Sequence, residues 1–292
     1  MTVSSRGHRG RLLLCTDLDR TLLPNGAQPE SPRAREAFRR LATQPDIVLV
    51  YVSGRDRALI ERAIVNYALP RPALAVGDVG TSIYDLRDGD WRSVDAWQAE
   101  IAPDWCGYDR PGLANVIGEF SILRLQEQSK QNTYKLSYYV PLHADRQALD
   151  RIIAERLGAI GVEASLVWSV DEPAGVGLLD VLPRSATKLH AVQFVRALLD
   201  VPIGHTVFAG DSGNDLPVLV SEIPSVLVAN AMPEVREEAC RLARASSSCE
   251  ALYVASGRLT GMNGNYAAGI IEGVLHYHPR LAASLDDFLD AG

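Results

Sequence analysis

The chain has 292 residues, a length that suits two domains better than one, and its 47% hydrophobic and 22% charged residues are ordinary for a soluble protein. The formal net charge of −7 disfavours nucleic acid as a partner, because an acidic chain gains nothing from releasing the counterions of DNA or RNA. No stretch approaches the roughly 20 apolar residues of a membrane span, and the apolar run 12–15 is too short for a signal peptide.

The four cysteines form no CxxC pair and show no zinc-ligand spacing. This pattern indicates free, buried or partly buried thiols in a reducing compartment. We therefore expect a cytoplasmic protein.

The first part of the chain alternates between apolar runs and helical patterns. We expect strands over residues 12–16, 47–52 and 73–76 and helices over residues 31–42 and 56–67. Ser31 is the predicted N-cap of the first helix, with Pro32 at its first position. This order of elements is typical of a parallel sheet covered by helices.

The pattern changes between residues 83 and 183. Segments such as 136–140 mix apolar and polar residues, an amphipathic helix is expected over 146–157, and all four tryptophans fall in this stretch. These features favour an inserted α/β domain with an antiparallel sheet.

The first pattern resumes near Lys188. The predicted elements are helices over residues 187–200, 215–220 and 232–244 and strands over 206–209 and 225–229. The predicted fold class is therefore α/β, with a Rossmann-like parallel-sheet core formed by residues 1–86 and 184–292 and an inserted α/β cap domain at 87–183.

Four short motifs follow predicted strands or begin a predicted helix. In chain order they are Asp17-Leu18-Asp19-Arg20-Thr21, Ser53-Gly54-Arg55, Lys188 and Gly210-Asp211-Ser212-Gly213-Asn214-Asp215. Each alone is typical of a solvated turn or a surface lysine. Together they predict a site, because ligands bind in open α/β sheets at the carboxyl ends of the strands.

The residue types of these motifs favour a metal and a phosphate group. Carboxylates gathered at one sheet edge repel one another unless a cation lies among them, and magnesium prefers hard oxygen ligands such as Asp17, Asp19 and Asp211. Ser53 and Lys188 add a hydroxyl group and a positive charge for phosphate oxygens.

The order of the motifs resembles that of phosphatases of the haloacid dehalogenase superfamily, one branch of which carries an α/β cap where this chain has its insertion. Four stretches are similar to sucrose-6-phosphate phosphatase and its relatives, namely Val79–Ile83, Tyr134–Tyr139, Gly210–Asp215 and Tyr266–Ile271. The resemblance implies Mg²⁺-dependent hydrolysis of a sugar phosphate through an aspartyl-phosphate intermediate, with sucrose 6-phosphate as the first candidate.

The resemblance also implies a role for each motif residue. Asp17 is the expected nucleophile, Asp19 the general acid and base, and Lys188 the cation that neutralises the phosphate and Asp17. The expected substrate-binding residues are Thr21, Ser53, Gly54, Arg55, Lys135 and Asn214. The expected Mg²⁺ ligands are Asp17, Asp19 (through its backbone carbonyl), Asp211 and Asp215.

Two positions leave alternatives open. Arg20 stands where the superfamily often has a small residue, and it either contacts phosphate or forms a salt bridge or points to solvent. Lys135 either faces the sugar or lies on the exposed side of a strand. The other polar and aromatic candidates for sugar contacts, which can equally belong to the cap core, are Gln131, Asn132, Tyr134, Tyr138, Trp168 and Asp171.

Other functions also remain open. The resemblance extends to mannosylfructose-phosphate phosphatase and other compatible-solute phosphatases, and a phosphomutase shares the superfamily. A catalytically inactive binding module is disfavoured, because Asp17, Asp19 and Lys188 are all present. We expect a small-molecule substrate, no nucleic acid or membrane, a monomer or weak dimer, and a sugar-phosphate synthase of the same pathway as a candidate partner.

Overall fold

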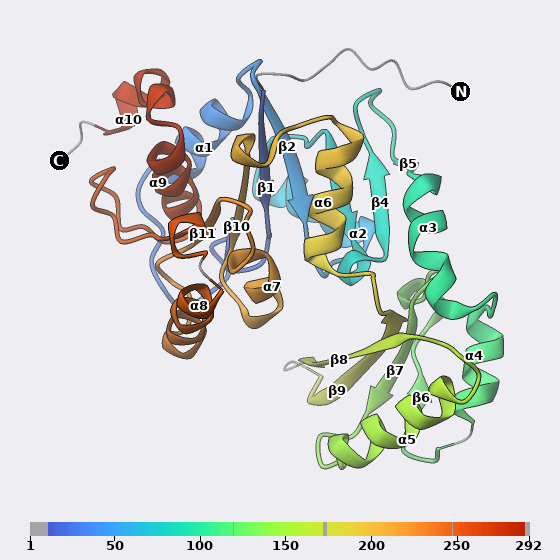
Figure 1. Cartoon of the computed structure of the whole chain (residues 1–292). Helices are drawn as coiled ribbons and strands as arrows, with labels where there is room; N and C mark the ends of the chain where they lie inside the picture. Colours follow the sequence, from blue (N-terminus) through green and yellow to red (C-terminus); the bar gives the residue numbers. More distant parts are fainter. Residues whose placement is uncertain (1–10, 119, 172–173, 247, 290–292) are drawn as a thin grey trace. The chain divides into compact units, whose positions relative to one another are not determined.

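The computed structural model describes residues 11–118, 120–171, 174–246 and 248–289. Contacts divide the chain into a core unit, Met1–Arg92 with Lys188–Gly292, and an inserted unit, Ser93–Thr187 (Figure 1). These limits lie a few residues after the predicted boundaries, because the hairpin of β4 and β5 prolongs the core sheet. Residues 1–10 and 290–292 of the predicted core domain lie outside the described residues.

Within the described residues, the core unit is built on an eight-stranded sheet in the order β12-β11-β10-β1-β2-β3-β4-β5. The strands are β1 Leu12–Thr16, β2 Ile47–Val52, β3 Leu74–Gly77, β4 Ser82–Asp85, β5 Arg92–Ser93, β10 Thr206–Gly210, β11 Ser225–Leu227 and β12 Leu252–Val254. Neighbours from β12 to β3 are parallel, and β4 is antiparallel to β3. The strand order reverses between β1 and β10, which places the switch point of the sheet beside the end of β1.

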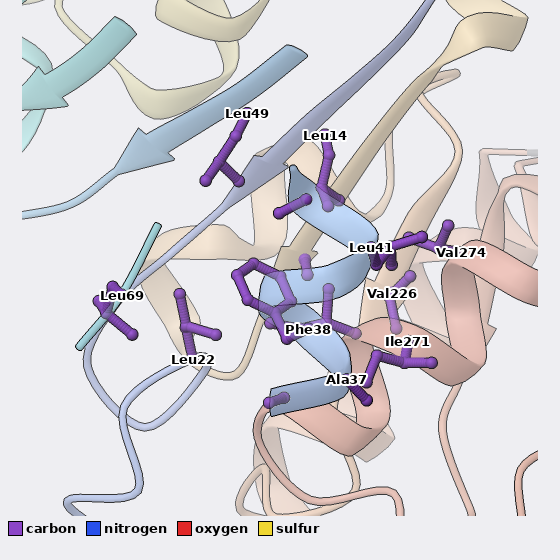
Figure 2. Packing of buried hydrophobic residues seen from close by; sticks show 14 of the residues in the cluster. Leu14, Leu22, Ala37, Phe38, Leu41, Leu49, Leu69, Val226, Ile271 and Val274 are labelled. Atoms are coloured by element: carbon purple, nitrogen blue, oxygen red, sulfur yellow. The ribbon is translucent and has the colours of Figure 1, made fainter. Parts of the chain in front are cut away.

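Helices cover the sheet. The core helices are α1 Ala34–Ala42, α2 Arg57–Asn66, α6 Lys188–Leu198, α7 Leu216–Leu219, α8 Pro233–Ala245, α9 Ala267–Tyr277 and α10 Asp286–Leu289. The short 3-10 helices are η1 Asp78–Gly80, η4 Ile203–His205, η5 Gly213–Asp215, η6 Cys249–Ala251 and η7 Pro279–Leu285. Figure 2 shows Phe38 of α1 and Ile271 of α9 in one apolar cluster with Leu14 of β1 and Leu49 of β2. Leu14 lies opposite Leu49 in the register of these strands, so the continuous apolar runs are buried by the helices.

The predicted N-cap of the first helix is wrong. Helix α1 begins at Ala34, and Arg33 before it has a left-handed backbone (φ 60°) and no side-chain cap. The Ser31 hydroxyl oxygen instead accepts a hydrogen bond from the backbone N–H of Asn263 at 2.9 Å. A tertiary contact therefore takes the side chain that local patterning assigns to the helix.

Among its described residues, the inserted unit contains a four-stranded antiparallel sheet in the order β6-β7-β9-β8. Its elements are β6 Arg124–Leu125, β7 Leu136–Val140, β8 Ala164–Asp171, β9 Val176–Pro183, α3 Asp95–Ile101, η2 Ala102–Trp105, α4 Arg110–Ile117, η3 Gln128–Lys130 and α5 Arg146–Gly158. Leu136, Tyr138 and Val140 alternate along β7 and pack into a core with Ile153 of α5. Trp91 lies in the same stretch of sequence as the other three tryptophans, but it belongs to the core unit, where it packs edge-to-face on Tyr84 of β4.

Two further predictions concern membrane-spanning helices and the cysteine thiols. No helix among the described residues is long and apolar enough to cross a bilayer. All four cysteines are free, as expected, and Cys15 is buried. The expectation that all are at least partly buried is wrong for Cys106 and Cys249, which are exposed.

Two glycines one turn apart on α9 allow this helix to approach the sheet closely. A Cβ atom at Gly273 would lie 2.1 Å from Val226 Cγ2, and one at Gly269 would lie 2.2 Å from the carbonyl oxygen of Gly264. Val226 belongs to β11, so a side chain at Gly273 would push α9 away from the strand. The close contact therefore depends on the absence of a side chain.

We predict that Gly273→Ala destabilises the protein by about 1–3 kcal/mol, the usual cost of overpacking. This outcome runs against helix propensity, which favours alanine by about 1 kcal/mol. Gly204→Ala is the matched control, because a Cβ atom there meets nothing within 4 Å. Urea unfolding of both variants checks the prediction. Equal stability of the two variants would show that α9 can shift at little cost.

Candidate active site

The loop after β1 places Asp17 at the switch point. The backbone N–H of Asp17 donates to Ala209 O at 2.9 Å, which continues the pairing of β1 with β10. The carbonyl of Leu18 then accepts the N–H groups of Leu22 and Leu23 at 3.0 and 2.8 Å, so the chain turns sharply. Both leucines are fully buried, and they anchor this turn to the core.

A second loop, after β10, brings Asp211 and Asp215 to the same place. Asp215 Oδ2 accepts the N–H groups of Asp211 and Ser212, both at 3.1 Å, and the Ser212 hydroxyl group at 2.9 Å. A Cβ atom at Gly210 would lie 2.6 Å from the Asp215 side chain, so a glycine is required there. The Gly-Asp-Ser-Gly-Asn-Asp motif is therefore a self-capped turn that holds one carboxylate rigidly.

Lys188 joins these two loops from the first position of α6. Its Nζ lies 2.7 Å from Asp215 Oδ1, 3.1 Å from Asp17 Oδ2 and 3.2 Å from Asn214 Oδ1. Burial alone would lower the pKa of Lys188, but Asp17 and Asp215 raise it well above its ordinary value. Lys188 is therefore a permanent buried cation between two carboxylates.

The residues fit a divalent cation. Carboxylate oxygens of Asp17, Asp211 and Asp215 lie within 4.8 Å of one another, and all three residues are buried. Burial raises the pKa of Asp17 to about 7 although Lys188 opposes the rise, and burial together with Asp215 raises that of Asp211 to about 6. Lys188 therefore balances only part of the negative charge of these carboxylates. Their oxygens are hard donors of the kind that Mg²⁺ prefers, and a bound Mg²⁺ would balance the rest. Asp215 Oδ2 accepts three hydrogen bonds, whereas Asp17 accepts one at each oxygen, from the Leu18 N–H and from Lys188, and Asp211 Oδ1 accepts one from Thr21. Asp17 and Asp211 therefore keep more lone pairs for a metal and are the better candidate ligands.

Asp19 points away from this carboxylate cluster. Arg55 Nη2 and Nε donate to Asp19 Oδ1 and Oδ2 at 2.6 and 2.7 Å, and Asn25 Nδ2 donates to Oδ1 at 2.7 Å. Burial would raise the pKa of Asp19, but the bonds from Arg55 and Asn25 and the charge of Arg55 lower it overall. Arg55, predicted to bind substrate, thus contacts Asp19 in this structure. Asn25 was not identified from the sequence, because no motif marks it.

Of three other predicted substrate residues, Thr21 contacts a carboxylate of the cluster, and Ser53 and Gly54 directly follow β2. The Thr21 hydroxyl group donates to Asp211 Oδ1 at 2.9 Å, so its proton is directed to a candidate metal ligand. Ser53 is buried and accepts the Arg55 N–H at 3.2 Å, while Gly54 is exposed beside it. Their contacts with phosphate stay predictions, as does a metal contact from the Asp19 carbonyl.

Arg20 forms a salt bridge, one of the three alternatives left open by the sequence. Its Nε lies 3.8 Å from Asp211 Oδ2, and its side chain is 41% exposed. Its backbone is left-handed (φ 58°), a conformation that glycine adopts more easily than a residue with a side chain. The N–H of Arg20 donates to Asn25 Oδ1 at 2.8 Å, and its carbonyl accepts Asn230 Nδ2 at 2.6 Å.

Lys135 of the inserted unit does not lie on an exposed strand face, so that interpretation is wrong. The residue is 8% exposed, and its Nζ lies 3.8 Å from Asp180 Oδ2. The Ser137 hydroxyl group donates to the other Asp180 oxygen, so the three residues form one buried polar group. Sequence reasoning missed Asp180, since a lone aspartate in a strand carries no signal.

The other cap candidates mostly support the inserted unit itself. Tyr138 is buried in its core, and Tyr134 packs edge-to-face on Trp105 at 5.5 Å. Trp168 Nε1 donates to Asp150 at 2.7 Å, and Asp171 Oδ1 accepts the N–H of Ala174 at 3.1 Å. Gln131 bonds to the backbone of Ser137 in both directions, and Asn132 accepts the N–H of Tyr134.

The fold and this constellation define a phosphohydrolase of the haloacid dehalogenase superfamily. A sequence model of the sucrose-6F-phosphate phosphohydrolase family matches residues 10–278. The chain therefore belongs to that family and is a phosphoric monoester hydrolase, which confirms the resemblance, the fold class and the type of enzyme expected from the sequence.

Several known proteins are similar to the chain. A Nitrosococcus oceani protein, described no further than HAD-like hydrolase, is 51% identical, with 94% of this chain and 74% of that protein covered. Mannosylfructose-phosphate phosphatase of Agrobacterium fabrum is 30% identical, with coverages of 91% and 96%. Sucrose-phosphatase 1 of Nicotiana tabacum is 26% identical over 92% of this chain, which spans 59% of the tobacco protein.

A solved structure shows the same fold. The sucrose-phosphatase of Synechocystis, in complex with sucrose and phosphate, has a TM-score of 0.68 at 23% sequence identity. The alignment covers 92% of this chain and 98% of the solved one.

We predict that Mg²⁺ raises the melting temperature of the EDTA-treated protein more at about pH 8 than at about pH 5.5. The pKa values of Asp17 and Asp211 are raised, so the metal-free fold is favoured at low pH and loses stability as pH rises toward about 7. Protons therefore compete with the metal at low pH. Thermal denaturation with and without Mg²⁺ at both pH values checks this.

The matched control is Asp211→Asn, which should lose most of the Mg²⁺-dependent shift. A shift as large at low pH as at high pH would contradict binding through these carboxylates.

Proposed function

We propose that this chain hydrolyses sucrose 6-phosphate to sucrose and inorganic phosphate with Mg²⁺ as its cofactor. The observation that carries the proposal is the buried constellation of Asp17, Asp211 and Lys188 at the switch point of the sheet. A carboxylate nucleophile beside a permanent cation suits phosphoryl transfer, which needs positioning and charge stabilisation above all. Membership of the sucrose-6F-phosphate phosphohydrolase family supports the choice of sugar.

In the proposed first step, a carboxylate oxygen of Asp17 forms a bond to phosphorus while the bond from phosphorus to the sugar oxygen breaks. Asp19 gives a proton to the departing sugar oxygen. Lys188 offsets charge on Asp17 and on the phosphoryl oxygens, and Ser53 can donate its hydroxyl hydrogen to one of them. When bound, Mg²⁺ would lower the pKa of Asp17 and Asp211 and neutralise charge on the phosphoryl group.

In the second step, water attacks the phosphorus atom of the aspartyl phosphate, and the bond to Asp17 breaks. Asp19, now ionised, takes the proton of the water, so both carboxyl groups return to their starting states. The lowered pKa of Asp19 in this structure suits its role as base and means that its bonds to Arg55 must loosen when it acts as acid.

A second candidate substrate is mannosylfructose phosphate. The phosphatase that carries this name is 30% identical and is covered almost over its whole length. Both substrates are phosphate esters of fructose-containing disaccharides, and the same phosphate machinery serves either. The choice between them rests on the sugar contacts, for which the buried group of Lys135, Ser137 and Asp180 is our candidate.

We expect kcat/KM for sucrose 6-phosphate to exceed that for mannosylfructose phosphate, glucosylglycerol phosphate and glucose 6-phosphate by about tenfold or more, because matched hydroxyl contacts discriminate strongly. Phosphate release with Mg²⁺ measures this. Asp17→Asn is the control for contaminating activity and should release no phosphate above background. A higher value for mannosylfructose phosphate would move the assignment to that sugar, and equal values for all four would refute disaccharide specificity.

We predict that Lys135→Ala lowers kcat/KM for sucrose 6-phosphate by about tenfold to a hundredfold, the worth of a charge-assisted hydrogen bond. The same change should alter kcat/KM for p-nitrophenyl phosphate little, because the aryl ester presents no sugar hydroxyls. Lys188→Ala is the matched comparison and should damage both substrates alike.

Lys135→Ala also leaves Asp180 without its cation, so melting temperatures are measured beside the kinetics. Equal losses on both substrates for Lys135→Ala would remove Lys135 from the sugar-reading residues.

A further inference from the structure

The Asp19 carboxylate is held by three N–H donors, and they are distributed unequally over its two oxygens. Oδ1 accepts from Arg55 Nη2 and Asn25 Nδ2, whereas Oδ2 accepts only from Arg55 Nε among the described residues. A carboxylate has about four lone-pair sites, two on each oxygen. Both sites of Oδ1 are therefore occupied, and one site of Oδ2 stays open.

Asn25 is itself fixed from both ends of its amide. Its Oδ1 accepts the backbone N–H of Arg20 at 2.8 Å while its Nδ2 donates to Asp19, so these partners determine the orientation of the amide. Its own N–H donates to Leu23 O at 2.9 Å. Asn25 thus ties the Asp19 side chain to the backbone of the loop that carries it.

The next residue, Gly26, lies close to Tyr266, the residue before α9. A Cβ atom at Gly26 would lie 2.7 Å from the Tyr266 hydroxyl oxygen and 3.2 Å from Gln28 Oε1. Tyr266 is fully buried and its hydroxyl group donates to Gln28 O at 3.1 Å. The bonds that hold Asn25 to Arg20 and Leu23 involve backbone groups of its own loop and not the Arg55 side chain.

We propose that Asn25 is a positioning residue for Asp19, an inference that rests on the acid–base role given to Asp19 under the proposed function. By occupying Oδ1 together with Arg55, Asn25 makes Oδ2 the oxygen that carries the proton to the leaving sugar and from the attacking water. When a proton replaces the Arg55 Nε–H at Oδ2 of Asp19, the hydrogen bond from Asn25 to Oδ1 remains. The carboxyl group therefore stays fixed at Oδ1 while Oδ2 gives and takes the proton.

Two variants test this. Asn25→Asp preserves the shape and the acceptor for the Arg20 N–H but places an oxygen against Asp19, and Asn25→Ala removes the donor without adding charge. Asn25 is exposed, so both variants are expected to fold, which melting temperatures check. Asn263→Ala is the control, because Asn263 is an exposed loop asparagine whose side chain, like that of Asn25, bonds to loop backbone: Nδ2 donates to Pro29 O, and Oδ1 accepts the N–H of Asn265.

The readout is the dependence on the leaving group. For both variants, kcat/KM for the best sugar phosphate of the panel should fall about tenfold or more, because misplacing a general acid costs part of its usual 10²–10⁴-fold contribution. For p-nitrophenyl phosphate, kcat/KM should stay within about twofold, since nitrophenolate departs without a proton. A pre-steady-state burst of nitrophenolate should appear, because hydrolysis of the aspartyl phosphate still needs Asp19 as base.

Asp19→Asn is measured beside the Asn25 variants. If Asp19→Asn loses the sugar phosphate selectively while both Asn25 variants affect the two substrates equally or not at all, the inference about Asn25 is overturned and the proposed function stands. If Asp19→Asn shows no such selectivity, the acid–base role fails and the inference about Asn25 fails with it.

Discussion

The candidate active site is organised around one buried ammonium group. Lys188 Nζ lies between Asp17 and Asp215, side chains that arrive from the ends of two neighbouring parallel strands. A buried carboxylate without a partner is costly, so the lysine offsets part of the cost of gathering carboxylates after β1 and β10. It compensates only part of the negative charge, which is why the pKa of Asp17 stays raised and why the cluster suits a divalent cation.

Two aspartates two residues apart have opposite electrostatic surroundings. Burial raises the pKa of Asp17 to about 7, whereas the bonds from Arg55 and Asn25 lower that of Asp19. When the surroundings of two carboxyl groups in one site shift their pKa values in opposite directions, the same residue type can serve two different chemical roles. The turn after β1 makes this separation possible, because it directs Asp17 into the cluster and Asp19 to the Arg55 fork.

Within the inserted unit, the candidate sugar-binding residues are also buried and paired. Lys135, Ser137 and Asp180 hold one another, while most of the aromatic candidates serve the packing of the unit. A buried polar group whose members are paired is positioned before a ligand arrives, which favours discrimination between sugars that differ in hydroxyl arrangement.

The parallel sheet, the inserted unit and the residues at the ends of β1, β2 and β10 could be predicted from the sequence, since they follow from local patterns: short apolar runs, helical periodicity, and polar motifs directly after strands. Which side chains meet could not be predicted in this way, because it depends on the folded chain. Thr21 bonds to Asp211, Ser31 to Asn263 and Lys135 to Asp180, and each pair joins segments far apart in the chain. The hydrogen bonds from Arg55 to Asp19 also join segments far apart in the chain, and no sequence motif marks Asn25. Local patterns report backbone conformation and burial, whereas the partner of a polar side chain is set by the distant segment that the fold brings within hydrogen-bonding distance.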